Sequence, residues 1–266
     1  ASETPIQVGG TDEIAELGAA FEQSRQTIQA QLSSLREREA ALRNYIANTT
    51  HDVMLPLSVL QGHLVSLQQR IVSGESLDAN AIVPSIEESQ YLGSLLHNLN
   101  AAARLEATEG LGHRDKIDLN RLVERVVERH RPVASRKKIA LDMAVPEATV
   151  ELPGDLTLLE QALGNLVQNA VRYNHPGGHI AVVLRGHSAA WSLEVIDDGP
   201  GIPEAERERV LEPSFRGSEA RTRHPHGMGL GLHIVSDVAK RHGLALTLRE
   251  TDGGGLSATL RPRRDT

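Results

Sequence analysis

The sequence predicts a multidomain protein, in which an α-helical coiled-coil part, expected to form a four-helix-bundle dimerisation domain, precedes an α/β sandwich. A helical repeat of apolar residues runs through about residues 11–72. A second amphipathic helix follows, and beyond Gly110 and Gly112 short strand-like runs alternate with helical stretches. Interleaved strands and helices indicate layered α/β structure. At 266 residues the chain is also long enough for two or three domains.

The first helix is predicted by apolar residues that alternate at spacings of three and four. These residues are Ile14, Leu17, Phe21, Ile28, Leu32, Leu35, Leu42, Ile46, Val53, Leu57, Leu60, Leu64, Leu67 and Ile71. A stripe so narrow and long is typical of a coiled-coil seam, which one helix cannot bury alone. Gaps near Arg25 and Glu39 indicate breaks or stutters in its packing. A solvated charged helix is the alternative, and the length of the pattern argues against it.

The second helix completes a predicted hairpin. The polar stretch Ser73–Asn80 ends the first helix at Gly74. The apolar side of the next helix consists of Ile82, Ile86, Leu92, Leu96, Leu99 and Ala103. A lone hairpin leaves one face bare, so we expect two copies to pair as a homodimer.

The remaining chain reads as an α/β sandwich. The strand-like runs are 139–143, 180–184, 193–196, 244–248 and 256–260, and the helical stretches are about 120–134, 155–173 and 229–242. A stretch from about Pro203 to Gly227 is rich in Pro, Gly, Arg and His and has little periodicity. Its length indicates a functional lid or loop.

Composition excludes several classes of function. The net charge of −7 gives no reason to expect nucleic-acid binding. The absence of cysteine excludes disulfides, Cys-ligated zinc and a thiol nucleophile. We find neither a signal peptide nor an apolar run near the length of a membrane span. Because the chain begins at Ala1 rather than Met, we expect it to be a fragment of a longer protein.

Three segments carry chemistry in the α/β part. In the first, an apolar strand runs into Asp197, followed by the turn Gly199-Pro200-Gly201. The carboxylate of Asp197 leaves the strand end toward a cavity, and glycines let the backbone approach a flat ligand. Alone, this segment could equally be an acidic β-turn.

The second segment, His226–Leu232, places the alternating glycines Gly227, Gly229 and Gly231 immediately before a helical run. Glycines at a helix N-terminus expose backbone N–H groups to a phosphate. A flexible linker is the alternative for this spacing alone.

The third segment, Glu160–Tyr173, places Asn165 and Asn169 on one helix face, with Arg172 three residues further on. Two carboxamides and a guanidinium there could hold a hydrated Mg²⁺ and a triphosphate. Asn residues on an exposed helix face are the alternative, although Asn is a poor helix former.

In this order, the three segments resemble the N box and the two glycine boxes of the Bergerat (GHKL) ATP-binding fold in its histidine-kinase form. Glu212–Gly217 resembles the phenylalanine-containing box of the lid. The resemblance covers about Ile117 to Pro262, and the joint pattern is far more specific than any single box.

The resemblance implies ATP and Mg²⁺ as cofactors and a role for each matching residue. Asp197 would accept a hydrogen bond from the adenine amino group, helped by water near Gly201. Asn169 would coordinate Mg²⁺, with Asn165 close by, and Glu160 could polarise a water or support the Mg²⁺ shell. The other residues expected to bind the nucleotide are Arg172, Tyr173, Gly199, Phe215, Gly227, Gly229, Leu230 and Gly231.

Among 12 histidines, His51 has a distinctive neighbourhood. It lies just off the coiled-coil seam, so its imidazole should reach solvent. The adjacent Asp52 can orient the ring and take its proton. Pro56 removes an N–H from the helix and should kink it. The segment resembles the H box of histidine kinases, which implies that His51 is the phosphoacceptor and Asp52 its base.

Leu55 departs from the family pattern. Many relatives have Thr or Asn at this position, which is associated with dephosphorylation of the partner. Leu55 cannot hydrogen-bond a water, so we predict weak or absent phosphatase activity.

Residues Thr11–Leu17 with Phe21 resemble the end of a HAMP linker, which implies a membrane-spanning helix and a sensor before Ala1. The predicted domains are therefore 1–34, the end of HAMP and a signalling helix; 35–109, the dimerisation and phosphotransfer hairpin; and 110–266, the ATP-binding domain. The expected location is the cytoplasmic part of a bacterial inner-membrane protein.

The predicted function is that of a sensor histidine kinase: autophosphorylation of His51 with ATP, then transfer to an aspartate of a response regulator. Hinge motion near Glu109–Arg114 would bring His51 to the nucleotide. Two alternatives remain. One is a nucleotide-gated switch like gyrase or mismatch-repair proteins, which lack the His51 hairpin. The other is a pseudokinase scaffold, although the ATP boxes are complete.

Overall fold

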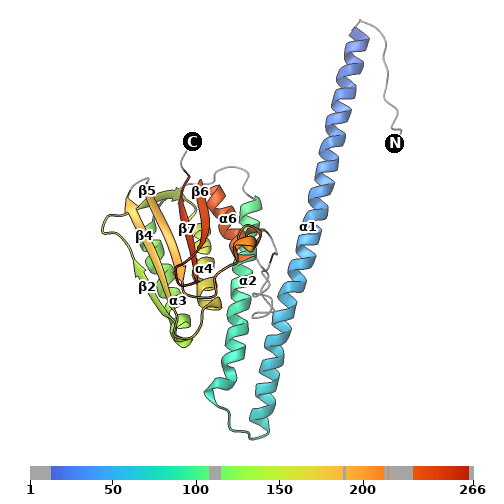
Figure 1. The fold of residues 1–266 in the computed structure, drawn as a ribbon. Coiled ribbons are helices and arrows are strands. Elements are labelled where there is room, and N and C mark those ends of the chain that lie inside the picture. The colour runs from blue at the N-terminus through green and yellow to red at the C-terminus, as the bar shows by residue number, and fades with distance from the viewer. Residues whose placement is uncertain (1–12, 108–114, 188–189, 213–214, 216–229, 264–266) are drawn as a thin grey trace. The chain divides into compact units, whose positions relative to one another are not determined.

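The computed structural model describes residues 13–107, 115–187, 190–212, 215 and 230–263 (Figure 1). The chain divides into two compact units, Ala1–Ser58 and Val59–Thr266. The expected hinge at Glu109–Arg114 and most of the expected lid lie outside the described residues. Among the described helices, none is both long enough and apolar enough to cross a membrane.

The helix α1 (Glu13–Val72) confirms the prediction of one long helix. It continues through the gaps near Arg25 and Glu39 and through Pro56, so neither interrupts the helix. Pro56 has no N–H to donate to the preceding turn. Close to it, the hydroxyl of Ser58 donates a hydrogen bond to the backbone carbonyl of Met54 at 2.8 Å.

The chain then reverses direction, as the sequence predicted (Figure 1). The loop after Val72 is held by a hydrogen-bonded pair between Arg70 and Glu75 (2.8 Å). A 3-10 turn, η1 (Ala79–Ile82), is capped by the side chain of Asp78 and leads into α2 (Val83–Ala107). Exposed apolar side chains gather in this part of the chain, namely Leu64, Val65, Ile71, Val72, Ile82, Val83 and Leu96.

A five-stranded sheet forms the α/β part, in the order β2 (Ala140–Ala144), β4 (His179–His187), β5 (Ala190–Asp197), β7 (Leu256–Pro262) and β6 (Leu244–Glu250). Strands β2 and β4 are parallel and the other neighbours are antiparallel. All five predicted strands are present. Two more, β1 (Asp115–Asp118) and β3 (Glu151–Gly154), form a small antiparallel ladder that the sequence did not predict.

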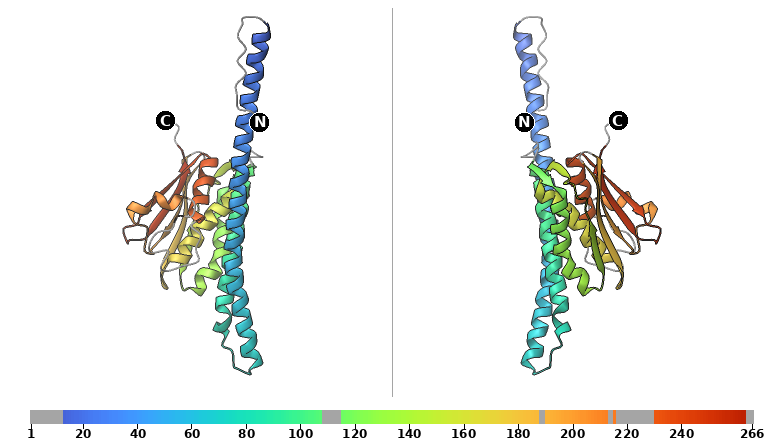
Figure 2. Two further views of the ribbon diagram at one scale, coloured as in Figure 1. Left: turned by 90° about the vertical axis from the view of Figure 1, so that its right-hand side faces the viewer. Right: turned by 90° about the vertical axis from the view of Figure 1, so that its left-hand side faces the viewer.

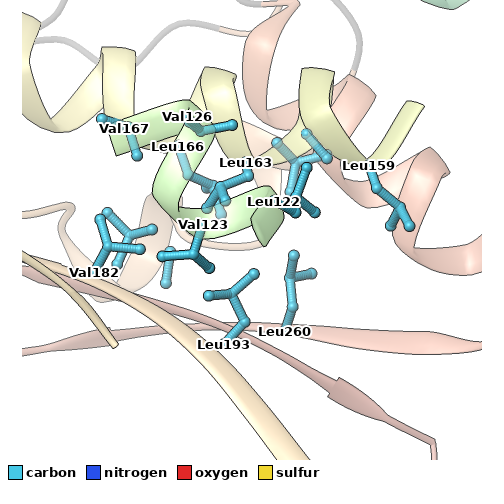
Figure 3. Packing of buried hydrophobic residues seen from close by; sticks show 14 of the residues in the cluster. Leu122, Val123, Val126, Leu159, Leu163, Leu166, Val167, Val182, Leu193 and Leu260 are labelled. Atoms are coloured by element: carbon cyan, nitrogen blue, oxygen red, sulfur yellow. The ribbon is translucent and has the colours of Figure 1, made fainter. Parts of the chain in front are cut away.

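Three helices, α3 (Leu119–Arg136), α4 (Leu156–Tyr173) and α6 (Gly231–Arg241), cover one face of this sheet (Figures 1 and 2). The core lies between the two layers, where Leu163 and Leu166 of α4 meet Leu193 of β5 (Figure 3). Each of these three side chains is at most 3% exposed. The predicted α/β sandwich is therefore confirmed.

Helix α2 also packs against α4 and α6. The side-chain amide of Gln161 donates to Oδ1 of Asn98 at 2.7 Å, and that of Gln168 donates to the hydroxyl of Ser94. Arg241 of α6 donates to the carbonyl of Leu105 at 3.1 Å. These contacts bring α2 beside the residues of the third sequence segment.

Candidate functional site

A cavity opens at the C-terminal end of β5, between α4, α6, α2 and the segment that follows β5. Nine of the residues expected to bind the nucleotide line it: Asn165, Asn169, Arg172, Tyr173, Asp197, Gly201, Phe215, Leu230 and Gly231. They come from four stretches far apart in the sequence, and the fold brings them to one place. Gly227 and Gly229 lie outside the described residues.

The two carboxylate oxygens of Asp197 have different surroundings. Its Oδ1 atom accepts backbone N–H groups from Gly199 (2.9 Å) and Leu256 (3.3 Å). Among the described residues, no hydrogen bond reaches Oδ2. Since Asp197 lines the cavity, Oδ2 is an acceptor available to a ligand there.

Burial raises the pKa of Asp197 above its ordinary value. The two backbone N–H groups act in the opposite direction, and the neighbouring carboxylate of Asp198 acts in the same direction as burial. A carboxylate with a raised pKa at a cavity wall is typical of a functional site.

Glycines bring the backbone close around Asp197. A Cβ on Gly255 would lie 1.9 Å from the carbonyl oxygen of Asp197. Gly201 has a φ of +68°, and a Cβ there would lie 2.7 Å from the carbonyl oxygen of Gly254. Gly199 is buried beside Asp197 rather than lining the cavity. Gly201 in the turn after β5 and Gly255 just before β7 therefore have no room for a side chain.

The two asparagines of α4 have different surroundings. Asn165 is 3% exposed, and its side chain accepts from Gln161 (3.4 Å) and donates to the carbonyl of Gly231 (3.3 Å). The carboxamide of Asn169 makes no hydrogen bond within the described part of the chain, although it lines the cavity. Asn169 is thus the side chain with a free amide oxygen, and amide oxygens suit Mg²⁺.

The end of α4 carries a cation beside aromatic rings. The guanidinium of Arg172 lies 5.4 Å from the ring centre of Tyr91 on α2 and 5.9 Å from that of Tyr173. Both distances are within the range of cation–π attraction. This places a positive charge at the cavity wall, next to α2.

The described first part of the expected lid makes several contacts with its surroundings. Arg207 donates to the carbonyl of Ile202 (2.9 Å) and pairs with Glu250 (2.8 Å). The short 3-10 helices η2 (Glu204–Glu206) and η3 (Arg209–Leu211) follow. Arg209 stacks over the ring of Phe215 at 4.3 Å, and Nδ1 of His233 on α6 meets the carbonyl of Leu211 at 3.0 Å.

The expectation for Glu160 is wrong. Its carboxylate pairs with Arg125 and Arg129 of α3, and it is not among the residues that line the cavity. The helix rotates this side chain toward α3, because Glu160 is five residues before Asn165 and so faces another direction.

His51 and Asp52 lie within α1, in the first unit, and the structure does not describe their side chains. The neighbouring Leu55 is 51% exposed.

Sequence reasoning missed the contribution of α2 to the cavity. Tyr91, Ser94, Leu95 and Asn98 line it. The apolar periodicity of α2 predicted only bundle packing, and no local signal marks a polar residue that will meet another domain. Glu206 and Val210 also line the cavity, from a stretch without periodicity.

Comparison with known proteins adds independent information. Residues 154–266 match the family described as histidine kinase-, DNA gyrase B-, and HSP90-like ATPase. The probable sensor histidine kinase TcrY of Mycobacterium tuberculosis is 32% identical over 94% of this chain and 53% of its own length. The signal transduction histidine-protein kinase/phosphatase MprB, also of M. tuberculosis, is 34% identical over 94% of this chain and 48% of its own length.

Among solved structures, the Acinetobacter baumannii histidine kinase AdeS has a TM-score of 0.56 at 22% identity, covering 79% of this chain and 95% of its own, which supports the fold alone. The chain spans about half the length of the curated relatives it matches. With its α/β sandwich, its helical hairpin and these relatives, the chain belongs to the sensor histidine kinases, and residues 154–266 are its ATPase domain of the GHKL type.

Proposed function

We propose that this chain uses ATP to phosphorylate its own His51 and then passes the phosphoryl group to an aspartate of a response regulator. One observation carries the nucleotide half of the proposal. On one cavity, Oδ2 of Asp197 and the carboxamide of Asn169 are each without a hydrogen bond to any described residue. A free carboxylate acceptor and a metal-binding amide on the wall of one cavity suit a nucleoside triphosphate.

In this proposal the adenine lies at the β5 end of the cavity. Its amino group donates to Oδ2 of Asp197, while Gly201 leaves room for a bridging water. Apolar side chains from the cavity wall cover the ring, among them Ile202, Val210 and Leu230. Such a pocket is mostly apolar, with a few polar groups that fix the orientation of the ligand.

The triphosphate extends along α4 toward the start of α6. Asn169 would hold Mg²⁺, which would neutralise phosphate charge, and Arg172 contributes a further positive charge. The N–H groups of Gly227, Gly229 and Gly231 wrap the phosphates at the N-terminal end of α6. Asn165 lies beside Asn169 on the cavity wall and holds the carbonyl of Gly231 in place.

At His51, a ring nitrogen attacks the γ-phosphorus in line. A nitrogen–phosphorus bond forms, the bond from the γ-phosphorus to the bridging oxygen breaks, and ADP leaves. Asp52 takes the proton from the other ring nitrogen. The domain supplies positioning and charge stabilisation, as in phosphoryl transfer generally.

The hairpin serves as the dimerisation and phosphotransfer domain, residues 35–109, between the HAMP end at 1–34 and the ATP-binding domain at 110–266. Its exposed apolar residues, for example Leu64 and Ile71, are 48% and 62% exposed in a single chain. A second copy buries this surface in a four-helix bundle. The whole protein then acts on the cytoplasmic side of a bacterial inner membrane.

Leu55 makes this chain a poor phosphatase, because a leucine cannot orient a water. The relative MprB is named a kinase/phosphatase, so the two activities are measured separately. Loss of phosphate from the phosphorylated response regulator, added with ADP and Mg²⁺, should be no faster with this chain than without it. Rapid loss that persists in His51→Gln contradicts the role given to Leu55.

The proposal as a whole is tested by incubating the chain with γ-labelled ATP and Mg²⁺. The expected product is protein label that is lost in acid and kept in base, as for phosphohistidine. Omitting Mg²⁺ should abolish it. Nucleotide binding without any label would identify a binding scaffold rather than a kinase.

A further inference from the structure

Asp198, the residue after Asp197, joins three elements of the domain. Its Oδ1 atom accepts the side-chain amide of Asn174 at 2.8 Å and the backbone N–H of His179 at 2.8 Å. Asn174 is the C-cap of α4, and His179 is the first residue of β4. A single carboxylate at the end of β5 thus links the end of α4 to the start of β4.

The cluster is too close for any side chain at Gly178. A Cβ there would lie 2.4 Å from Oδ1 of Asn174 and 2.8 Å from Oδ1 of Asp198. Asn174 in turn accepts the backbone N–H of His175 at 2.8 Å, so its side-chain orientation is fixed. The carboxylate of Asp198, the side-chain amide of Asn174 and the backbone N–H of His179 are therefore held in one arrangement.

The charge of Asp198 suits this arrangement. Burial would raise its pKa, but the N–H of His179, the amide of Asn174 and the nearby His175 hold the pKa below the ordinary value. Asp198 is therefore ionised at neutral pH, and hydrogen bonds to an ionised acceptor are the stronger kind.

The elements that Asp198 links hold the residues proposed to bind the two ends of the nucleotide. Gly199, in the turn that follows Asp197, rests on the end of α4: a Cβ on it would lie 3.5 Å from the carbonyl oxygen of Tyr173. Asn169 and Arg172, on the last turns of α4, precede its linked C-cap Asn174. In the same way, Asp197 precedes the linking residue Asp198.

We propose that Asp198 is a positioning residue for the nucleotide, which sets the location of the adenine acceptor Asp197 relative to the phosphate-binding face of α4. The inference rests on the proposed nucleotide site. A ligand that bridges two groups is held tightly only if both groups keep their relative position. Without the link, each end still binds its part of the ligand, but not both at once at full strength.

The test measures the affinity of the chain for a non-hydrolysable ATP analogue with Mg²⁺ by calorimetry. Asp198→Ala should weaken binding about tenfold or more, the scale of losing hydrogen bonds to a charged group. Asp198→Asn should stay within about threefold of the wild type, since its Oδ1 can accept both donors. Gly178→Ala should weaken binding without altering either carboxylate.

Asp142→Ala is the matched control. This carboxylate pairs with the side chain of the same His179 at 2.9 Å, but among the described residues it makes no hydrogen bond or ion pair with α4 or β5. Its removal should leave the affinity unchanged. A wild-type chain that does not bind the analogue overturns the proposed nucleotide site itself, and with it this inference.

If the wild type binds and Asp198→Ala binds equally well, the positioning role alone is overturned. The same conclusion follows if the loss of affinity in Asp198→Ala is not rescued by Asp198→Asn and matches a fall in the unfolding midpoint, because that pattern is general destabilisation. If Asp198→Ala does not fold, the affinities of Gly178→Ala and Asn174→Ala for the analogue test the proposal instead. Unchanged affinity in both variants overturns the positioning role of Asp198.

Discussion

The backbone N–H of Leu256 donates to Oδ1 of Asp197 at 3.3 Å, across 59 residues of sequence. With the N–H of Gly199 on the same oxygen, it turns the carboxylate so that Oδ2 has no hydrogen-bond donor among the described residues. Two backbone groups thus orient the proposed adenine acceptor. Backbone donors are fixed by the fold, so the acceptor is oriented before any ligand arrives.

Asp197→Asn should lower the affinity for nucleotide without lowering the stability of the folded chain. The amide keeps an oxygen for Gly199 and Leu256, but places an N–H₂ donor where Oδ2 faced the ligand. Nucleotide affinity should fall by on the order of 100-fold, because a donor then meets the adenine amino group.

The folded chain should lose no stability, because a neutral group replaces a buried charge. Calorimetric titration and thermal unfolding of the same sample test both parts. Unchanged affinity removes Asp197 from the site, and a large fall in the unfolding midpoint contradicts its described environment.

Nucleotide affinity should depend on pH through Asp197. Burial raises its pKa, so protonation begins at a higher pH than for an ordinary aspartate, near 3.9. A protonated carboxyl accepts the adenine amino group less well, and affinity should therefore fall as the pH is lowered through this raised pKa.

The effect on folding has the opposite sign. A raised pKa favours the folded state below the ordinary aspartate pKa, and this contribution is lost as the pH rises through the folded-state pKa. Asp197→Asn should remove the acid fall in relative affinity. If wild type and variant show the same pH profile, Asp197 is not the titrating group.

Truncating Asn169 should change ATP binding, whereas truncating Asn165 should change the stability of the fold. Asn169→Ala should remove the Mg²⁺-dependent part of ATP affinity and leave the unfolding midpoint unchanged, because no described residue depends on its amide. Asn165→Ala breaks buried bonds to Gln161 and Gly231 and should cost about 1–3 kcal/mol of stability.

Titrations with and without Mg²⁺, together with thermal unfolding, distinguish the two asparagines. The assignment is reversed if Asn165→Ala removes the Mg²⁺ dependence and Asn169→Ala does not.

Helix α2 should be coupled to the glycine-rich end of the site. Gln161 donates to Asn98 on α2 and to Asn165, and Asn165 donates to the carbonyl of Gly231. Asn98→Ala and Gln161→Ala should therefore have non-additive effects on nucleotide affinity, with a coupling of about 0.5–3 kcal/mol.

The control for this coupling is Ser94→Ala combined with Gln161→Ala. Ser94 contacts Gln168, a neighbouring α2–α4 contact that does not lead to Gly231. That pair should be additive. Additive behaviour in both pairs would show that the contacts of Asn98 do not reach the glycine box.

Periodicity was sufficient to predict most of the fold. The long run from Ile14 to Ile71 predicted α1, and the alternation around Val182 and Leu193 predicted two central strands. The strands β1 and β3 are four residues each, too short to show an alternation of apolar and polar residues. They form because they pair with each other.

The candidate site was predicted where its residues lie next to one another in the chain. Asn165, Asn169 and Arg172 share a helix face, and Asp197 ends a strand, so local geometry places them. Glu160 was misplaced because its partners, Arg125 and Arg129, belong to α3, and only the packed structure shows them. The α2 residues were missed for the same reason, since their role depends on contacts with α4.

The central claim is that His51 receives the phosphoryl group. The most direct measurement is the acid-labile label from γ-labelled ATP on His51→Gln beside two matched variants on the same hairpin, His63→Gln and His97→Gln. Nδ1 of His97 is bonded to the carbonyl of Gly93 at 2.7 Å, and neither histidine is followed by an acidic residue. Full label is expected on both controls and none on His51→Gln. Undiminished label on His51→Gln would contradict it.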